Sequence, residues 1–162
     1  MKSYSEVSES VFPKNVLRMY SMARKIVARI EDANGKYKGL EDRWIRCHEV
    51  ARIVHELLKP KWETTVVDGR YGTKLRGSGV DHSWLVYSES PEWATRNSVT
   101  GAEDRFILDV YAIARLPMVQ LVSTDIGHRL LYTPLEGRND INESFVRQQV
   151  QQIRKYVWQV KL

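Results

Sequence analysis

Hydrophobic residues recur along the chain with two different periods, and the change of period divides it into helical and strand-like parts. From Pro13 to Asn34 the apolar residues lie three or four positions apart, as on one face of a helix. The Asn34-Gly35 pair predicts the end of this helix, because glycine is common just after the last helical residue. A second helix is expected over residues 41–59, and Pro60 closes it. The first sixty residues are therefore predicted to form two helices.

After Pro60 the hydrophobic period becomes two, which is typical of strands. Strands are expected over residues 62–67, 80–87, 106–113 and 118–122. We interpret Asp68-Gly69 as a turn after the first strand, because this pair is common in turns. Residues 123–139 show no clear period and are expected to be irregular.

A last helix is predicted near the C-terminus. Asp140 and Glu143 have the spacing of a capping box, and apolar residues follow them at helical intervals. The order of two helices, several strands and one helix predicts an α+β domain, with the N-terminal helices packed on a mainly antiparallel sheet. The whole chain, residues 1–162, is expected to be a single domain in which residues 1–10 are flexible.

Composition supports a packed domain. The chain has 162 residues, is 43% hydrophobic, and contains five Trp and eight Tyr, which argues against intrinsic disorder. Its formal net charge is +5, and residues 1–60 hold twelve Lys and Arg against eight Asp and Glu. Acids interrupt the basic residues throughout, so a nucleic-acid partner is not expected.

The sequence contains no long apolar segment. No run approaches the roughly 18 to 20 residues of a membrane helix, and the first residues lack the apolar core of a secretory signal. A single cysteine, Cys47, cannot form an internal disulfide bond. We therefore expect a cytoplasmic protein with no membrane partner.

The second predicted helix has two different faces. Cys47 shares one face with Val50 and Val54, which are apolar, so its thiol is expected on the core side. His48 and His55 belong to the other face, which is polar. A lone cysteine in such a place is often only a small buried hydrophobic residue.

Two later strands carry the groups that can activate a thiol. His82 lies on the strand at 80–87, and Asp109 lies on the strand at 106–113. If these strands are antiparallel neighbours, side-chain alternation places His82 and Asp109 side by side. The imidazole can then accept the proton of Cys47, and the carboxylate can orient the imidazole. Asp109 interrupts an otherwise apolar strand, where an unpaired carboxylate is costly, so it needs such a partner.

These segments together resemble the transglutaminase-like branch of the papain-like cysteine protease superfamily. The resembling motifs are Arg46-Cys47-His48-Glu49-Val50-Ala51-Arg52, Thr65-Val66-Val67-Asp68-Gly69-Arg70-Tyr71-Gly72, His82-Ser83-Trp84-Leu85-Val86 and Ile107-Leu108-Asp109. The resemblance implies a papain-like or transglutaminase-like fold and acyl transfer through a thioester, without a cofactor. It also implies that Cys47 is the nucleophile, His82 the base and Asp109 the orienting acid. The chain departs from the family where Val110 follows Asp109, since Pro-Thr often stands there, and no upstream Gln for an oxyanion hole is evident.

The function expected from this resemblance is that of a cysteine-dependent hydrolase or transferase, which cleaves a peptide or amide bond of a peptide or protein substrate. Aromatic candidates for substrate binding are Trp44, Tyr71, Trp84, Trp93 and Tyr111. Trp44 is also a candidate partner of the Cys47 backbone N–H in an oxyanion hole.

Two alternatives stay open. The first is a catalytically inactive binding module on the same fold, which recognises a protein or anionic partner through the basic N-terminal helices and the polar stretch at 88–105. The second is a zinc site formed by Cys47, His82 and Asp109. His48-Glu49 begins like a zinc-protease helix, but the second His that this motif requires is replaced by Arg52.

Overall fold

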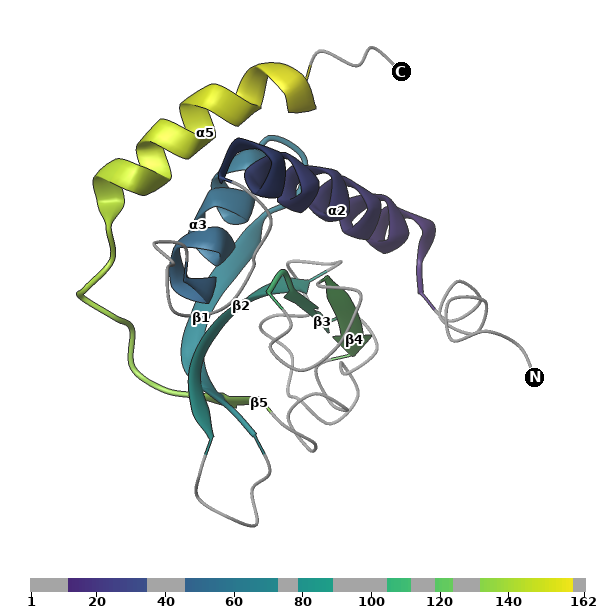
Figure 1. Cartoon of the computed structure of the whole chain (residues 1–162). Coiled ribbons are helices and arrows are strands. Elements are labelled where there is room, and N and C mark those ends of the chain that lie inside the picture. Colours follow the sequence, from purple (N-terminus) through teal and green to yellow (C-terminus); the bar gives the residue numbers. More distant parts are fainter. Residues whose placement is uncertain are drawn as a thin grey trace.

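A computed structural model describes residues 12–34, 46–72, 79–88, 105–111, 119–123 and 132–158. Within these ranges the elements follow in the order α2 (Lys14–Asn34), α3 (Cys47–Leu58), β1 (Thr64–Tyr71), β2 (Val80–Ser88), β3 (Arg105–Asp109), β4 (Gln120–Ser123), β5 (Tyr132–Pro134) and α5 (Glu143–Val157) (Figure 1). The expectation of a flexible stretch at residues 1–10 lies outside the described residues.

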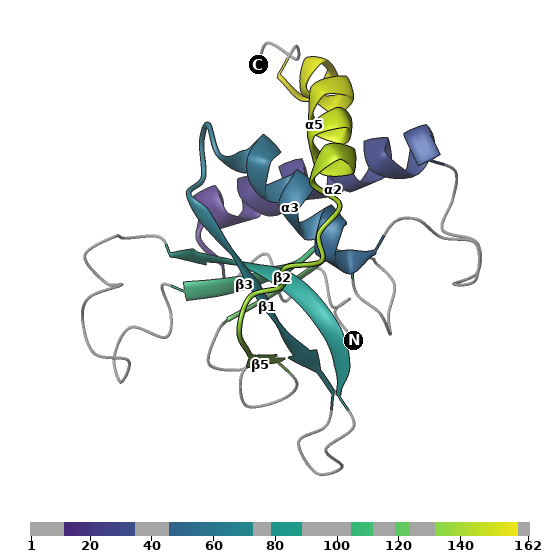
Figure 2. The same cartoon turned by 90° about the vertical axis from the view of Figure 1, so that its left-hand side faces the viewer.

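The five described strands form one sheet in the order β4-β3-β2-β1-β5. Every neighbouring pair is antiparallel. The three described helices lie on one side of this sheet (Figure 2). This arrangement confirms the prediction of a mixed helix and sheet protein with an antiparallel sheet.

The main hydrophobic core lies between the helices and the sheet. Helix α2 contributes Met19 and Ile26, and helix α3 contributes Val54 and Leu57. From the sheet, Leu85 and its neighbours on the same strand face complete this core. A smaller cluster of Trp84, Ile107 and Tyr132 covers the opposite face of the sheet. The two faces of β2 are therefore both buried, which is why this strand is apolar on both sides.

The pairing of β2 with β3 decides where the candidate site lies. Val86 is opposite Ile107, and Leu85 is opposite Leu108. Continuing this antiparallel register by one step brings Asp109 opposite Trp84, two residues from His82 and on the same face of the sheet. The expected neighbourhood of the two strands is confirmed.

The segment Asp68-Gly69, which we interpreted as a turn, lies inside strand β1. A Cβ atom at Gly69 would meet the backbone oxygen of Thr133 in β5 and would lie 2.6 Å from the Trp84 ring. The glycine therefore allows the close approach of another strand and a ring, and the same property makes it resemble a turn residue in the sequence.

The region after residue 123 also differs from the expectation. Residues 132–134 form the edge strand β5. A strand of three residues is too short to show a hydrophobic period in the sequence. The last helix begins at Glu143, and its N-cap is Asn142, whose side chain accepts a hydrogen bond from the N–H of Phe145. Asp140 instead forms ion pairs with Arg46 and Arg138. Among the described helices, none is long and apolar enough to cross a membrane.

Candidate active site

Cys47 is the first residue of helix α3, and Arg46 is its N-cap. The first hydrogen bond of the helix runs from the N–H of Val50 to the carbonyl oxygen of Arg46. The N–H groups of Cys47, His48 and Glu49 therefore have no acceptor within the helix, and Arg46 provides no side-chain cap. A thiol in this position lies at the positive end of the helix dipole, which favours its anionic form.

His82 and Asp109 are in direct contact. Nε2 of His82 donates to the Asp109 carboxylate, with distances of 3.0 Å to Oδ1 and 2.9 Å to Oδ2. Both side chains are buried. The hydroxyl of Tyr132 donates to Oδ2 at 2.6 Å, and the N–H of Tyr111 donates to Oδ1 at 3.1 Å. The buried carboxylate that interrupts the apolar strand is thus fully partnered, as burial of a charge requires.

Aromatic rings enclose the imidazole of His82. The rings of Tyr71, Trp84 and Tyr132 lie 5.7, 6.1 and 6.5 Å from it, measured between ring centroids. Burial and the neighbouring Asp109 raise the pKa of Tyr132, so its hydroxyl stays protonated and acts as a donor. The rings hold the imidazole in one orientation, because the space around it is filled.

The thiol of Cys47 lies beside the start of β2. Its sulfur is 4.0 Å from the carbonyl oxygen of Asp81, the residue before His82. Asp109 occupies Nε2 of His82, while Nδ1 is buried and has no hydrogen-bond partner among the described residues. Nδ1 is therefore the nitrogen that is free to interact with the sulfur.

The ionisation of Cys47 depends on this neighbourhood. Burial by itself raises the pKa of the thiol, but contacts with His48 and then His82 outweigh it and lower the pKa to about 6. Burial also opposes the charge on His82, yet Asp109 and then Cys47 raise the pKa of the imidazole to about 9. Between these two values the thiolate and the imidazolium form an ion pair, which is the reactive form of a thiol nucleophile.

His48 is not on a solvated polar face, as we expected from the sequence, but is 4% exposed. Its Nδ1 lies 2.6 Å from the hydroxyl of Ser83 on β2. The next polar residues of the helix also face the sheet, because Arg52 contacts Asp68 and His55 contacts Thr64. Helix α3 lies between the sheet and the other helices, so both of its faces are covered (Figure 2).

A second buried carboxylate organises this side of the site. Asp68 accepts hydrogen bonds from Ser83 at 2.5 Å, from Arg52 at 2.8 Å and from the N–H of Arg138 at 3.1 Å. Burial raises the pKa of Asp68, but Arg52 and Ser83 outweigh that effect and lower it. We missed Asp68 and Ser83 in the sequence. The available signal was that the polar residues 64 and 68 occupy one face of β1 and match the polar residues of helix α3.

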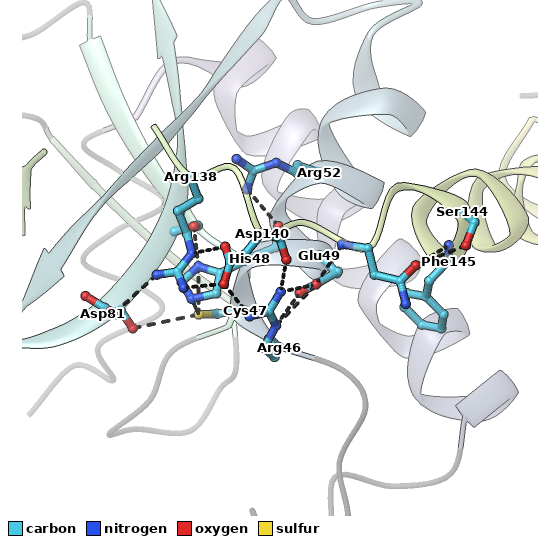
Figure 3. A network of polar contacts seen from close by, with 12 residues as sticks. Arg46, Cys47, His48, Glu49, Arg52, Asp81, Arg138, Asp140, Ser144 and Phe145 are labelled. Carbon is cyan, nitrogen blue, oxygen red and sulfur yellow. Dashed lines mark hydrogen bonds and ion pairs between the residues drawn. The ribbon is translucent and has the colours of Figure 1, made fainter. Parts of the chain in front are cut away.

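The segment between β5 and α5 crosses the start of helix α3 (Figure 3). Arg138 pairs with Asp81 at 3.2 Å and with Asp140 at 2.9 Å. Asp140 also pairs with Arg46 at 3.0 Å, next to the thiol. These ion pairs join the residues before Cys47 and before His82 to one segment of chain.

The aromatic residues expected to bind substrate lie in different places. Trp84 is completely buried beneath His82, where it supports the imidazole and has no surface for a substrate. Tyr71 and Tyr111 are half-buried. Trp44 and Trp93 lie outside the described residues. A role in substrate binding stays a prediction for Tyr71 and Tyr111.

Two other features of the described residues lie apart from this chemistry. Within the described ranges, no group of three or more His, Cys, Asp and Glu residues is arranged to hold a metal ion. A hollow of about 420 Å³ lies between α2 and α5, and Arg29, Gln152 and Tyr156 are among its lining residues. None of the lining residues belongs to the thiol site.

The protein that this geometry defines is a mixed helix and sheet protein with a thiol, an imidazole and a carboxylate in one buried cluster. No family model matches the chain, and no curated protein or solved structure matches it either.

Proposed function

We propose that this protein is a cysteine-dependent acyl-transfer enzyme that hydrolyses a peptide or amide bond through a thioester on Cys47. The contact that carries the proposal is the buried hydrogen bond between His82 and Asp109, which leaves the other imidazole nitrogen free for the thiol. The lowered pKa of Cys47, about 6, also supports the proposal, because the sulfur is then anionic at neutral pH. A buried cysteine that only fills space has no need of either property.

The proposed reaction has two halves. The thiolate of Cys47 attacks the carbonyl carbon, and the C–N bond breaks as the imidazolium of His82 gives its proton to the leaving amine. Water then attacks the thioester while His82 accepts a proton from it, and the C–S bond breaks to restore the thiolate. Asp109 keeps the imidazole in one tautomer throughout. The N–H groups at the start of α3, which have no acceptor within the helix, are suited to stabilise the oxyanion.

The fold that we propose is papain-like, of the transglutaminase-like branch. Its support is the order of the parts, with a cysteine at the start of a helix, a histidine on the next strand but one, and an aspartate on the strand paired to it. The order agrees with the family, although Val110 follows Asp109 in this chain.

The experiment is selective alkylation followed by intact-mass measurement. Limiting iodoacetamide at pH 7 is expected to label the wild type quickly, and Cys47→Ala not at all. His82→Asn should slow the labelling about tenfold or more, because a higher thiol pKa leaves less thiolate. His55→Asn is the matched control, since His55 lies on the same helix and contacts Thr64 instead of the thiol. Labelling of the native protein no faster than that of the urea-unfolded chain would rule out an activated thiol.

A second candidate function is supported by the burial of the site. Cys47 is 7% exposed and His82 has no exposed surface, so a substrate has to displace other groups to reach the sulfur. A binding module on the same fold has no such requirement. Helix α2 presents Lys14, Arg24 and Lys25 on its exposed surface, which suits an anionic partner.

The two candidates separate on one substitution. If the Cys47→Ala variant folds normally but no longer turns over a peptide library, the enzymatic function is supported. If Cys47→Ala retains the full cellular function of the wild type, the binding module replaces it.

A further inference from the structure

The sulfur of Cys47 lies against a second imidazole besides that of His82. Sγ is 3.7 Å from Nδ1 and 3.8 Å from Nε2 of His48, the next residue of helix α3. Figure 3 shows the imidazole of His48 directly beside the thiol. Neighbouring residues of a helix point in different directions, so this contact is not a routine consequence of their sequence positions.

The hydrogen bonds around His48 decide which of its nitrogens is available. The hydroxyl of Ser83 donates its proton to the Asp68 carboxylate, which can only accept. The oxygen of Ser83 therefore accepts from His48, and Nδ1 of His48 carries a proton. Nε2 is left as the nitrogen that can take up or release a proton beside the sulfur.

The contacts that hold His48 resemble those that hold His82, because a buried carboxylate stands behind each imidazole. Asp109 holds His82 directly, whereas Asp68 holds His48 through the hydroxyl of Ser83. Both carboxylates are buried, at 1% and 7% exposed. Arg52 balances the charge of Asp68 with an ion pair of 2.8 Å. The two supports reach the sulfur from different elements, one from β2 and one from helix α3 itself.

We propose that His48 is a second catalytic residue of the thiol site, positioned by Asp68 through Ser83, and that its Nε2 shares in holding the proton that leaves Cys47. This inference rests on the proposed function and adds a residue to it. Before the attack, His48 helps His82 to keep the sulfur anionic. In the second half of the reaction, the same contact makes the sulfur a better leaving group from the thioester.

Other charged groups lie near the thiol, and they include both positive groups, which favour the thiolate, and negative groups, which oppose it. They are Arg46 before helix α3, Asp81 on β2, Asp109 on β3 behind His82, and Arg138 on the segment after β5. Arg138 and Asp81 form an ion pair, as do Arg46 and Glu49, so their charges largely offset each other. The two imidazoles are the groups that touch the sulfur itself.

The test is the pH dependence of alkylation, measured with iodoacetamide on the full chain from pH 5 to 10. The wild type is expected to show a midpoint near the Cys47 pKa of about 6. His48→Asn is expected to raise the midpoint by about one pH unit, and therefore to slow labelling at pH 5.5 about tenfold with little change at pH 9. Ser83→Ala should raise the midpoint by less, because His48 remains but is no longer held.

The chain contains a matched control for both variants. His55 also lies on helix α3, and its Nδ1 is 2.7 Å from the hydroxyl of Thr64 on β1. His55→Asn and Thr64→Val remove the same kinds of group away from the sulfur, so the midpoint should stay at its wild-type value in both. A structural loss alone would change thermal stability without moving the midpoint.

The outcomes separate the two proposals. A wild-type midpoint near that of an ordinary thiol would overturn both the proposed function and the role of His48. A low wild-type midpoint that His82→Asn raises, and that neither His48→Asn nor Ser83→Ala changes, would overturn the role of His48 and leave the proposed function intact. If His48→Asn does not fold, as circular dichroism would show, the midpoint of Ser83→Ala decides.

Discussion

At the scale of single residues, Asp109 determines what His82 can do. Its carboxylate is 1% exposed and accepts from His82, from the Tyr132 hydroxyl and from the Tyr111 N–H. Its hydrogen bond and its negative charge raise the pKa of His82. The imidazole is thereby kept charged at neutral pH, which in turn favours the thiolate of Cys47.

The ion pair between Cys47 and His82 has a consequence for stability. The Cys47 pKa falls from 9.0 to about 6 on folding, so its stabilising contribution grows as the pH rises from about 6 to 9 and is lost as the pH falls through 6. The His82 pKa rises from 6.5 to about 9, so its contribution is complete below 6.5 and is lost as the pH rises through 9. Between about 6.5 and 9 the two slopes are opposite and cancel, because folding moves one proton from sulfur to imidazole and takes up none.

We therefore predict that Cys47→Ala makes stability depend on pH where the wild type does not. Without the thiol, only the contribution of His82 remains, and the free energy of unfolding should fall as the pH rises from about 6.5 to 8.5. The expected slope, relative to wild type, is at most about 1.4 kcal/mol per pH unit. Urea denaturation of both proteins at pH 6.5, 7.5 and 8.5 measures it, and titrations that the two proteins share cancel in the difference. Parallel profiles would mean that the ion pair does not form.

At the scale of elements, helix α3 carries both the thiol of Cys47 and a polar stripe that faces the sheet. His48, Arg52 and His55 contact Ser83, Asp68 and Thr64 of strands β1 and β2. Each of these three side chains therefore has a partner on a strand, which fixes the helix along and around its axis. This orientation places Cys47, the first residue of the helix, next to His82.

Strand β1 depends on a glycine for its contact with β5. We predict that Gly69→Ala lowers the free energy of unfolding by about 1–3 kcal/mol, because the added methyl group meets backbone of β5 and the ring of Trp84. Urea denaturation at pH 7 measures the change. Gly137→Ala is the matched control, since its nearest new contact is Asp68 Oδ2 at 3.7 Å, an ordinary distance. Equal stability of both variants would show that β5 moves away without cost.

Some elements could be predicted from the sequence and others could not. The spans of α2 and β2 follow from local periodicity, and so does the placing of His82 and Asp109 on matching faces. The strand expected at 106–113 instead ends at Asp109. Strand β5 is too short to have a period, and it exists because β1 offers it an edge. Asp68-Gly69 looks like a turn because only the neighbouring strand and ring show why a glycine is needed there.

At the scale of the whole molecule, the segment between β5 and α5 connects the sheet to the helices across the start of α3. Glu49 of helix α3 is the buried group at this crossing and is 1% exposed. Its carboxylate bonds to Arg46 and accepts from the N–H of Asn142 at 3.3 Å. Arg46 also bonds to Asp140. Arg46, the residue before Cys47, thus holds both the buried carboxylate of Glu49 and the crossing segment.

This arrangement predicts that two arginines of the same network differ in importance. Arg46→Ala leaves the buried carboxylate of Glu49 without its cation and should cost about 2 kcal/mol, less than a fully buried pair because Arg46 is 39% exposed. Arg138→Ala should cost less than about 1 kcal/mol, because its partners Asp81 and Asp140 are 62% and 48% exposed and water can replace it. Urea denaturation at pH 7 compares them, and a larger loss for Arg138→Ala would contradict this reading of the network.

The sequence by itself determined which residues share a face of a helix or a strand, because backbone periodicity is local and needs no partner. On that basis Cys47, His82 and Asp109 could be selected as candidates for one site. Only the tertiary structure decided what covers each face, and therefore that His48 lies against the thiol and that Asp68 supports it. The physical reason is that the burial of a polar side chain depends on the elements packed against it. Those elements lie far away in the sequence or, as for strand β5, are too short to recognise.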